Sequence, residues 1–215
     1  MPSPLTTPVT TETPRLLLAG FGPFPQAPDN PAGRVVERLI AQAWSPAGAR
    51  LSGKVVPVSW SRAPEEVLAA AQTFGCDAIL LLASSSRAQD VRVEMRAQNR
   101  VGRRRADGEG LYWEQDRILP TGPGVVRATA PVAEMVQAIK AAGLPARASS
   151  ESGDFVGNFT LYRLLAELGE GAGRAVGCLG IPLRLDLDDV ERAVKAAAEA
   201  FASRLSALRP TRISA

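Results

Sequence analysis

The chain has 215 residues, of which 46% are hydrophobic, so it can bury one sizeable core and needs no second domain. Its 25 basic and 22 acidic residues leave a formal charge of +3, an excess too small to favour nucleic acid as a partner. It contains no histidine, which excludes the usual general base near neutral pH and the commonest metal ligand.

The two cysteines, Cys76 and Cys178, form neither a disulfide framework nor a cluster with metal-ligand spacing. The N-terminus shows no secretory signal and no membrane span. We therefore expect a cytoplasmic protein without a cofactor, a metal site or a membrane partner.

The termini differ in composition from the rest of the chain. Residues 1–14 are rich in proline and threonine with almost no apolar content, so burial cannot offset the entropy of ordering them. Residues 209–215 have a similar character. We expect a flexible tail at each end of a single domain formed by residues 15–208.

In the first half of this domain, short apolar runs alternate with segments of helical period, which is typical of βαβ units around a mostly parallel sheet. Strands are predicted at Leu16 to Ala19, Lys54 to Val58 and Ala78 to Leu82. The helix between the first two begins at Pro31 with Asn30 as its N-cap. The predicted buried faces of the two intervening helices comprise Val35, Val36, Leu39 and Ile40, and then Val67, Leu68, Ala71 and Phe74.

A strand with strict alternation follows. Its apolar side consists of Val91, Val93, Met95 and Ala97, and its polar side of Arg92, Glu94, Arg96 and Gln98. Because Glu94 lies between two arginines on one side, they are its expected ion-pair partners.

Residues 101–124 are rich in glycine, arginine and proline, and predict a long excursion or irregular hairpin, of the kind that often covers a site. The later elements are predicted as a helix from Pro131 to Gly143, a strand from Ala146 to Ser149, and a strand from Ala175 to Ile181. A helix carrying Phe159 and Tyr162 and a last helix from about Asp188 to Leu208 complete the chain, the last one burying Val190, Val194, Ala197, Phe201 and Leu205.

Separated segments resemble, in order, the motifs of the pyroglutamyl peptidase family. GFGPFPQAPDNP at 20–31 resembles its GFxPFGGxxxNP loop, and RAQDVRVEMRAQN at 87–99 the stretch that carries its catalytic glutamate. ATAPVAEMVQAIKAAGLPA at 128–146 resembles a helix entry of the family. SSESGDFVGN at 149–158 and CLGIP at 178–182 resemble the segments that carry its nucleophile and its base.

This resemblance implies a three-layer α/β/α sandwich with a mostly parallel twisted sheet. It aligns Glu94 with the family's catalytic glutamate. It aligns Gly157 with the family's catalytic cysteine and Gly180 with its catalytic histidine. Phe21 and Phe24 match the aromatic pair of the family's ring pocket. Ala83 and Arg87 belong to its substrate-binding turn, which reads ASSSR here. The chain is thus expected to be an inactive homologue with a modified pocket for a small acidic or pyroglutamyl-like ligand.

Several of these residues have more than one possible role. Glu94 is either a surviving acid or a structural ion-pair partner, and Cys178 is either a displaced nucleophile or a core residue. Ser149, Ser150, Ser152 and Asp154 are interpreted as caps of the following helix rather than as catalytic groups. Glu151, Asp154 and Glu94 form an alternative acid cluster.

These alternative roles of the residues correspond to alternative functions of the protein. One is a cysteine-independent hydrolase that acts on pyroglutamyl peptides or another amide. Another is a binder of acidic partners or nucleic acid through the run Arg100, Arg103, Arg104 and Arg105. This run could instead be a solvated loop or part of a homo-oligomer interface. Tyr112 and Trp113 could cap a pocket or pack in such an interface.

Overall fold

We analysed a computed structural model of the chain, which describes residues 13–169 and 173–208. The sheet has six strands in the order β2-β1-β3-β8-β4-β7, and a separate pair is formed by β5 and β6. The strands are β1 Arg15–Phe21, β2 Arg50–Val56, β3 Ala78–Ser85, β4 Val91–Glu94, β5 Arg96–Gln98, β6 Val125–Arg127, β7 Ala146–Ser149 and β8 Ala175–Pro182. The helices are α1 Pro31–Ala41, α2 Arg62–Phe74, α3 Val132–Ala141, α4 Val156–Leu168 and α5 Leu187–Leu208.

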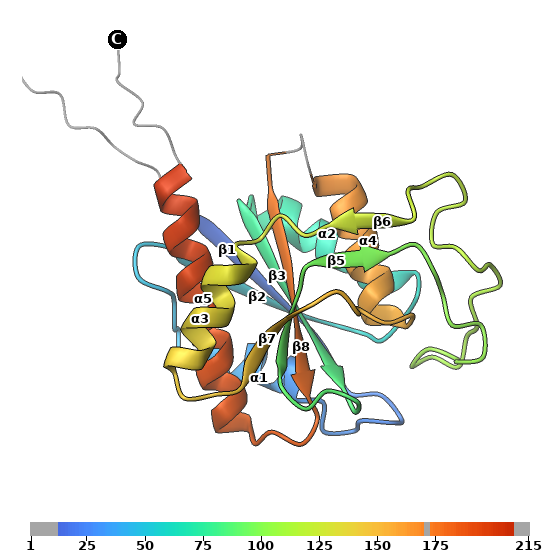
Figure 1. The fold of residues 1–215 in the computed structure, drawn as a ribbon, viewed down its shortest axis with the longest axis horizontal. Helices are drawn as coiled ribbons and strands as arrows, with labels where there is room; N and C mark the ends of the chain where they lie inside the picture. Colours follow the sequence, from blue (N-terminus) through green and yellow to red (C-terminus); the bar gives the residue numbers. More distant parts are fainter. Residues whose placement is uncertain (1–12, 170–172, 209–215) are drawn as a thin grey trace, which may run out of the picture.

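The helices cover both faces of the sheet, with α1, α3 and α5 on one side and α2 and α4 on the other (Figure 1). Strand periodicity explains this division. In β1, Leu16 and Leu18 pack toward α1, α3 and α5, whereas Leu17 and Ala19 pack toward α2 and α4. The predicted three-layer α/β architecture with a mostly parallel sheet is therefore confirmed.

One strand breaks the parallel pattern. Strand β4 runs antiparallel to β8 and parallel to β7, with Arg92 opposite Gly180 and Glu94 opposite Ser149. Val91 and Val93 face the core around α1, α3 and α5, so Arg92 and Glu94 point to the side of α4. The polar side of β4 therefore faces the layer that contains α4.

The N-terminal cap of α1 forms as predicted. The Asn30 side chain accepts a hydrogen bond from the Ala32 backbone N–H at 3.2 Å and donates one to the Gly22 carbonyl at 2.9 Å. Asn30 is almost fully buried. It therefore fixes the turn after β1 to the start of α1.

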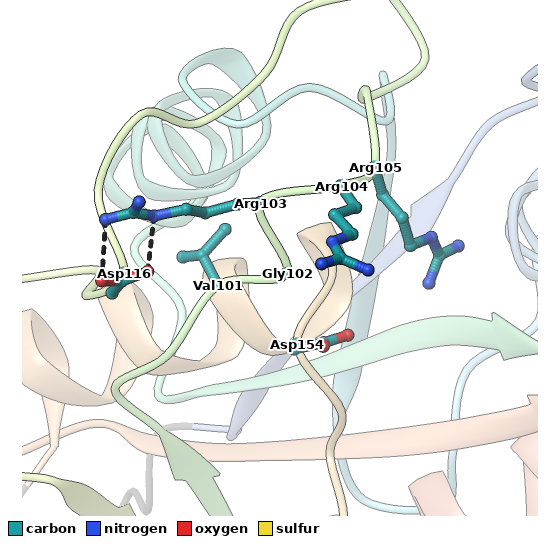
Figure 2. A pocket seen from close by; sticks show the side chains of 7 residues that line it. All are labelled: Val101, Gly102, Arg103, Arg104, Arg105, Asp116 and Asp154. Atoms are coloured by element: carbon teal, nitrogen blue, oxygen red, sulfur yellow. Dashed lines mark hydrogen bonds and ion pairs between the residues drawn. The ribbon is translucent and has the colours of Figure 1, made fainter.

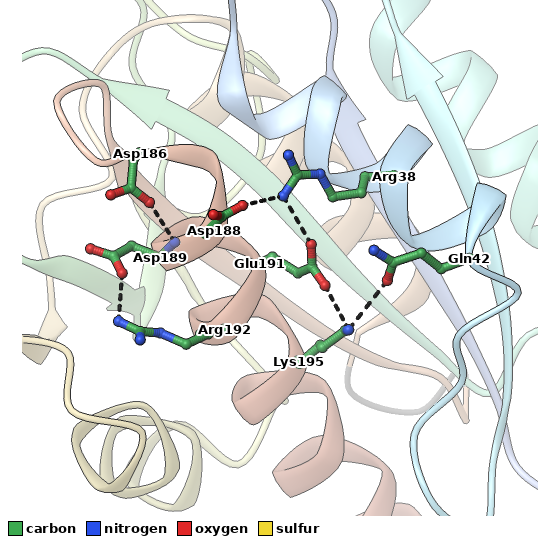
Figure 3. A network of polar contacts seen from close by, with 8 residues as sticks. All are labelled: Arg38, Gln42, Asp186, Asp188, Asp189, Glu191, Arg192 and Lys195. Carbon is green, nitrogen blue, oxygen red and sulfur yellow. Dashed lines mark hydrogen bonds and ion pairs between the residues drawn. The ribbon is translucent and has the colours of Figure 1, made fainter.

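A polar network joins α1 to α5 at the surface (Figure 3). Arg38 contacts both Asp188 and Glu191, and Lys195 links Glu191 to Gln42 at 2.6 Å and 3.3 Å. These contacts lie at the rim of the helical layer, where solvent screens them.

Some predicted details are wrong. The strand predicted over 91–98 stops at Glu94, because the chain changes partners at Met95. The Met95 N–H still donates to the Ser149 carbonyl of β7, whereas its own carbonyl accepts from Ala128, which follows β6, and the chain continues as β5. Met95 is 41% exposed instead of buried, and Ile40 is 43% exposed. Leu68, Phe74 and Leu205 are only partly buried. The second strand occupies Arg50–Val56 rather than residues 54–58.

Residues 99–124 contain no helix and no strand and connect β5 to its antiparallel partner β6, so the predicted irregular hairpin is confirmed. Figure 1 shows this loop extending beside α4. Within the described residues, no helix combines the length and the apolar character needed to cross a membrane. The predicted tails, 1–14 and 209–215, fall almost entirely outside the described residues.

Candidate functional site

A cavity of about 660 Å³ lies between the N-terminal end of α4, the end of β3 and the polar side of β4. We call it the main pocket. Its lining includes every residue that the sequence singled out as a site candidate on the basis of resemblance: Phe21, Phe24, Ala83, Arg87, Glu94, Gly157 and Gly180. Segments that are far apart in the sequence thus meet at one place.

Gly157 lies in the first turn of α4, whose N-cap residue Phe155 makes no side-chain capping hydrogen bond. A Cβ atom at position 157 would lie 3.0 Å from the Ala83 Cβ and 4.0 Å from Phe21. The site therefore admits a small side chain after a slight shift of Ala83. In this chain the helix terminus presents only backbone N–H groups.

The predicted capping role of the serines before α4 is wrong. Ser149 accepts a hydrogen bond from the Glu151 N–H, and Ser152 donates to the Asn158 side chain at 2.7 Å. Asn158 in turn binds the backbone of Gln98 in β5. These hydroxyls hold the loop and β5 in place instead of closing the helix end.

Glu94 is only 2% exposed. Its Oε1 atom lies 3.4 Å from the Arg92 Nε, while its Oε2 atom has no hydrogen-bond partner among the described residues. Burial raises the pKa of this carboxyl, and the Ser149 hydroxyl and Arg92 act in the opposite direction. The predicted ion pair with Arg92 is confirmed, whereas Arg96 donates to the Ser150 carbonyl.

Arg92 was missed as a site residue. A Cβ atom at position 180 would lie 3.0 Å from the Arg92 Nε and 3.2 Å from the Glu94 Oε1. The Arg92 side chain therefore fills the space that a side chain at position 180 would need. The sequence held the signal, because alternation puts Arg92 on the same side as Glu94, but only strand pairing brings it opposite Gly180.

The thiols show no sign of activation. Cys178 lines the main pocket but is buried, and burial raises its pKa well above the usual thiol value, with Glu94 acting in the same direction. Burial also raises the pKa of Cys76 to about 11. A thiolate is the reactive form, so these environments favour the core interpretation of both cysteines.

Aromatic side chains form one wall of the main pocket. Phe24 lies 6.3 Å from Phe155, and Trp60 packs edge-on against Phe155 at 5.3 Å between ring centroids. Phe21 is almost fully buried behind them. Phe155 was not singled out from the sequence, because nothing in its local pattern separates it from a core residue.

A smaller hollow of about 350 Å³ adjoins the main pocket and shares Arg105 and Asp154 with it. Figure 2 shows Arg103 pointing toward Asp116, while Arg104 and Arg105 point away from that pair. The Arg103–Asp116 contact is bidentate, with a distance of 2.7 Å between Nη2 and Oδ2. Within the predicted arginine run, Arg103 thus forms an ion pair, whereas Arg100 and Arg105 line the main pocket.

Comparisons with known proteins agree on one family. The sequence profile described as pyroglutamyl peptidase matches residues 14–201. A pyrrolidone-carboxylate peptidase of Mycobacterium marinum is 34% identical over 159 residues, which cover 70% of this chain and 68% of that protein. One from Chromobacterium violaceum is 29% identical, with 74% of each chain covered.

Solved structures give the same result. The crystal structure of pyroglutamyl peptidase I from Bacillus amyloliquefaciens superimposes with a TM-score of 0.82 at 27% identity, covering 88% of this chain and 95% of that one. The pyrrolidone carboxyl peptidase of Thermococcus litoralis has a TM-score of 0.83 at 21% identity, with 94% and 99% covered, and supports the fold alone. The sequence profile, the relatives and the architecture together show that this chain belongs to the pyroglutamyl peptidase family.

Proposed function

We propose that this chain is a pyroglutamyl peptidase homologue that lacks the family's thiol chemistry and uses its main pocket to hold a small ligand. The observation that carries the proposal is the environment of Gly157, where a cavity lined by Glu94 meets a helix terminus that bears no nucleophilic side chain. The resemblance assigns the nucleophile to this position.

The Cys178 thiol in the cavity lining does not replace the missing pair. Cys178 is held as a neutral thiol by burial, and the sequence has no histidine to accept or deliver a proton. Removing the nucleophile of such a unit lowers the rate by about 10⁴- to 10⁶-fold. We therefore expect no turnover of pyroglutamyl substrates at the rate of a working peptidase.

The test is hydrolysis of a fluorogenic pyroglutamyl amide by the purified chain. The natural chain is expected to match the blank. Turnover by the natural chain that is resistant to thiol alkylation would overturn the proposal and favour a cysteine-independent hydrolase.

A rebuilt site tests the assignment of the two glycines. Because a side chain at position 180 meets Arg92, the rebuilt chain carries Gly157→Cys, Gly180→His and Arg92→Ala together. It is expected to gain slow turnover that alkylation abolishes. The matched control carries only Gly180→His and Arg92→Ala and is expected to stay silent, because it lacks the thiol.

Ligand binding by the natural chain supplies the second readout. A ligand that binds only the native state raises the melting temperature in proportion to its affinity and concentration. A pocket that still holds a small molecule predicts such a shift for at least one acidic compound.

A further inference from the structure

The main pocket carries a concentrated positive charge. Six arginines and three acidic residues line it, and no lysine does, which leaves a formal excess of three positive charges. This equals the net charge of the whole chain, so the rest of the sequence is balanced overall. The arginines are Arg87, Arg92, Arg96, Arg100, Arg105 and Arg147.

Several of these guanidinium groups remain available to a ligand. Within the described part of the chain, Arg87 and Arg100 make hydrogen bonds only through their backbone atoms, and their side chains have no ion pair. Arg105 lies over the Phe155 ring, 3.9 Å from its centroid, and no acidic residue of the described chain forms an ion pair with it. Arginine matches carboxylate and phosphate oxygens with a planar pair of donors, so these side chains are suited to anions.

The floor of the pocket also has unmet hydrogen-bonding capacity. Among residues 13–169 and 173–208, the Arg92 Nε and the Glu94 Oε2 are both buried without a hydrogen-bond partner. Leaving such groups unsatisfied costs free energy, which a bound molecule can recover.

The opposite wall restricts the shape of the ligand. Phe24 and Phe155 present aromatic surface to the same cavity, beside the uncapped N-terminal turn of α4. The cavity volume of about 660 Å³ lies in the range of ordinary small-molecule sites. A matching ligand combines anionic groups with a compact apolar part.

We propose that the main pocket binds a compact molecule carrying at least two carboxylate or phosphate groups, which Arg100, Arg105 and Arg92 contact together. This inference rests on the proposed function, because it names the class of ligand that the same pocket holds. A neutral pyroglutamyl group, with one lactam and no charge, leaves most of these donors unused.

The experiment is calorimetric titration of the full chain with citrate, pyrophosphate and neutral pyroglutamamide, at low and high sodium chloride. Citrate or pyrophosphate is expected to bind more tightly than the amide, and raised salt is expected to weaken that binding. The tighter of the two anions identifies the carboxylate or the phosphate as the preferred group.

Matched variants locate the site. Arg100→Gln removes an unpaired charge from the pocket and is expected to weaken anion binding by about tenfold without changing the melting temperature. Arg204→Gln makes the same charge change on α5, outside the pocket, and is expected to leave binding unchanged. Equal losses in both variants would mean that binding depends only on net charge and would overturn the proposal.

The same samples are assayed for pyroglutamyl amide hydrolysis, so that the two proposals can fail separately. A silent chain that binds neither anion more tightly than the amide overturns this inference alone. A chain that hydrolyses the amide yet binds anions through Arg100 overturns the inactivity proposal alone.

Discussion

At the scale of single residues, Arg92 occupies the space that a side chain at position 180 would need. Arg92 lies directly opposite Gly180 in the β4–β8 pair and fills the space beside it. Sequence alternation was sufficient to put Arg92 and Glu94 on one side of a strand. Alternation could not show that Arg92 lies beside Gly180, because which strand faces β4 depends on the order of the whole sheet.

The charge state of Glu94 leads to a prediction about pH. Burial raises the folded-state pKa above its unfolded value, so Glu94 contributes stability below the unfolded carboxyl pKa and this contribution is lost as pH rises through the folded pKa. Glu94→Gln removes this dependence. The variant should therefore gain stability relative to the natural chain as the pH rises from the ordinary carboxyl pKa of about 4 toward neutral, as measured by urea unfolding.

The control for this measurement is Glu151→Gln, which changes an exposed carboxyl on the same pocket. Its stability difference from the natural chain should vary little over the same range. If the stability difference of Glu94→Gln stays flat across these pH values, the pKa of Glu94 is the same in the folded and unfolded states, and its description as a buried carboxyl with a raised pKa is wrong.

Gly20 gives a second prediction at this scale. A Cβ atom there would lie within the contact distance of the Ala32 carbonyl at the start of α1, and backbone cannot yield as a flexible side chain does. Gly20→Ala should reduce the free energy of unfolding by about 3 kcal/mol. Gly124→Ala, where no atom lies within 4 Å of the added methyl, should change it by less than about 0.5 kcal/mol.

At the scale of elements, the loop between β5 and β6 is held by two buried polar residues. The Asn99 side chain accepts from the Ile118 and Leu119 N–H groups and donates to the Leu119 and Gly122 carbonyls. Asp107 accepts from the N–H groups of Trp60, Glu109 and Leu111. The sequence predicted an irregular excursion but not these attachments, since isolated Asn and Asp residues are common in loops.

Asn99→Ala should therefore loosen the loop. The substitution leaves buried backbone groups unpaired, at an expected cost of about 2 to 4 kcal/mol, and should speed proteolytic cleavage within residues 100–122. Asp116→Asn weakens only the exposed pair with Arg103 and should cost less than about 1 kcal/mol. Equal protection of the loop in Asn99→Ala and in the natural chain would contradict the anchoring role.

The helices were predicted more accurately than the polar strand β4. Asn30 and Pro31 marked the start of α1 correctly, because a cap is a local interaction. The break at Met95 was not predictable from alternation, because the same pattern continues through Ala97 while the chain changes partners from β7 to β6. Which strand a segment pairs with is a tertiary property.

At the scale of the whole molecule, the sequence predicted the layered α/β architecture through alternating strand and helix patterns, and the core clusters confirm it. The sequence patterns did not predict that residues 21, 94, 157 and 180 lie together. The family resemblance did, and all four line one cavity. Periodicity alone gives no distances between separate elements. The roles of these residues stay predictions until activity is measured.

The domain limits give a prediction for the intact chain. Removing residues 1–12 deletes a segment whose composition favours no packing, so the melting temperature and ligand binding should stay unchanged. Removing residues 1–18 also deletes Leu16, Leu17 and Leu18, which are buried in a central strand, and should abolish cooperative unfolding. A lower melting temperature after the shorter deletion would extend the domain toward the N-terminus.

The fixed loop between β5 and β6 has a kinetic consequence. Asn99 and Asp107 attach it on either side of Arg100 and Arg105, so the segment that carries these two lining residues is held in place before any ligand arrives. A charged molecule then needs no slow rearrangement to enter, and long-range attraction accelerates its arrival. Differences in affinity among such molecules should therefore appear mainly in how long each one stays bound.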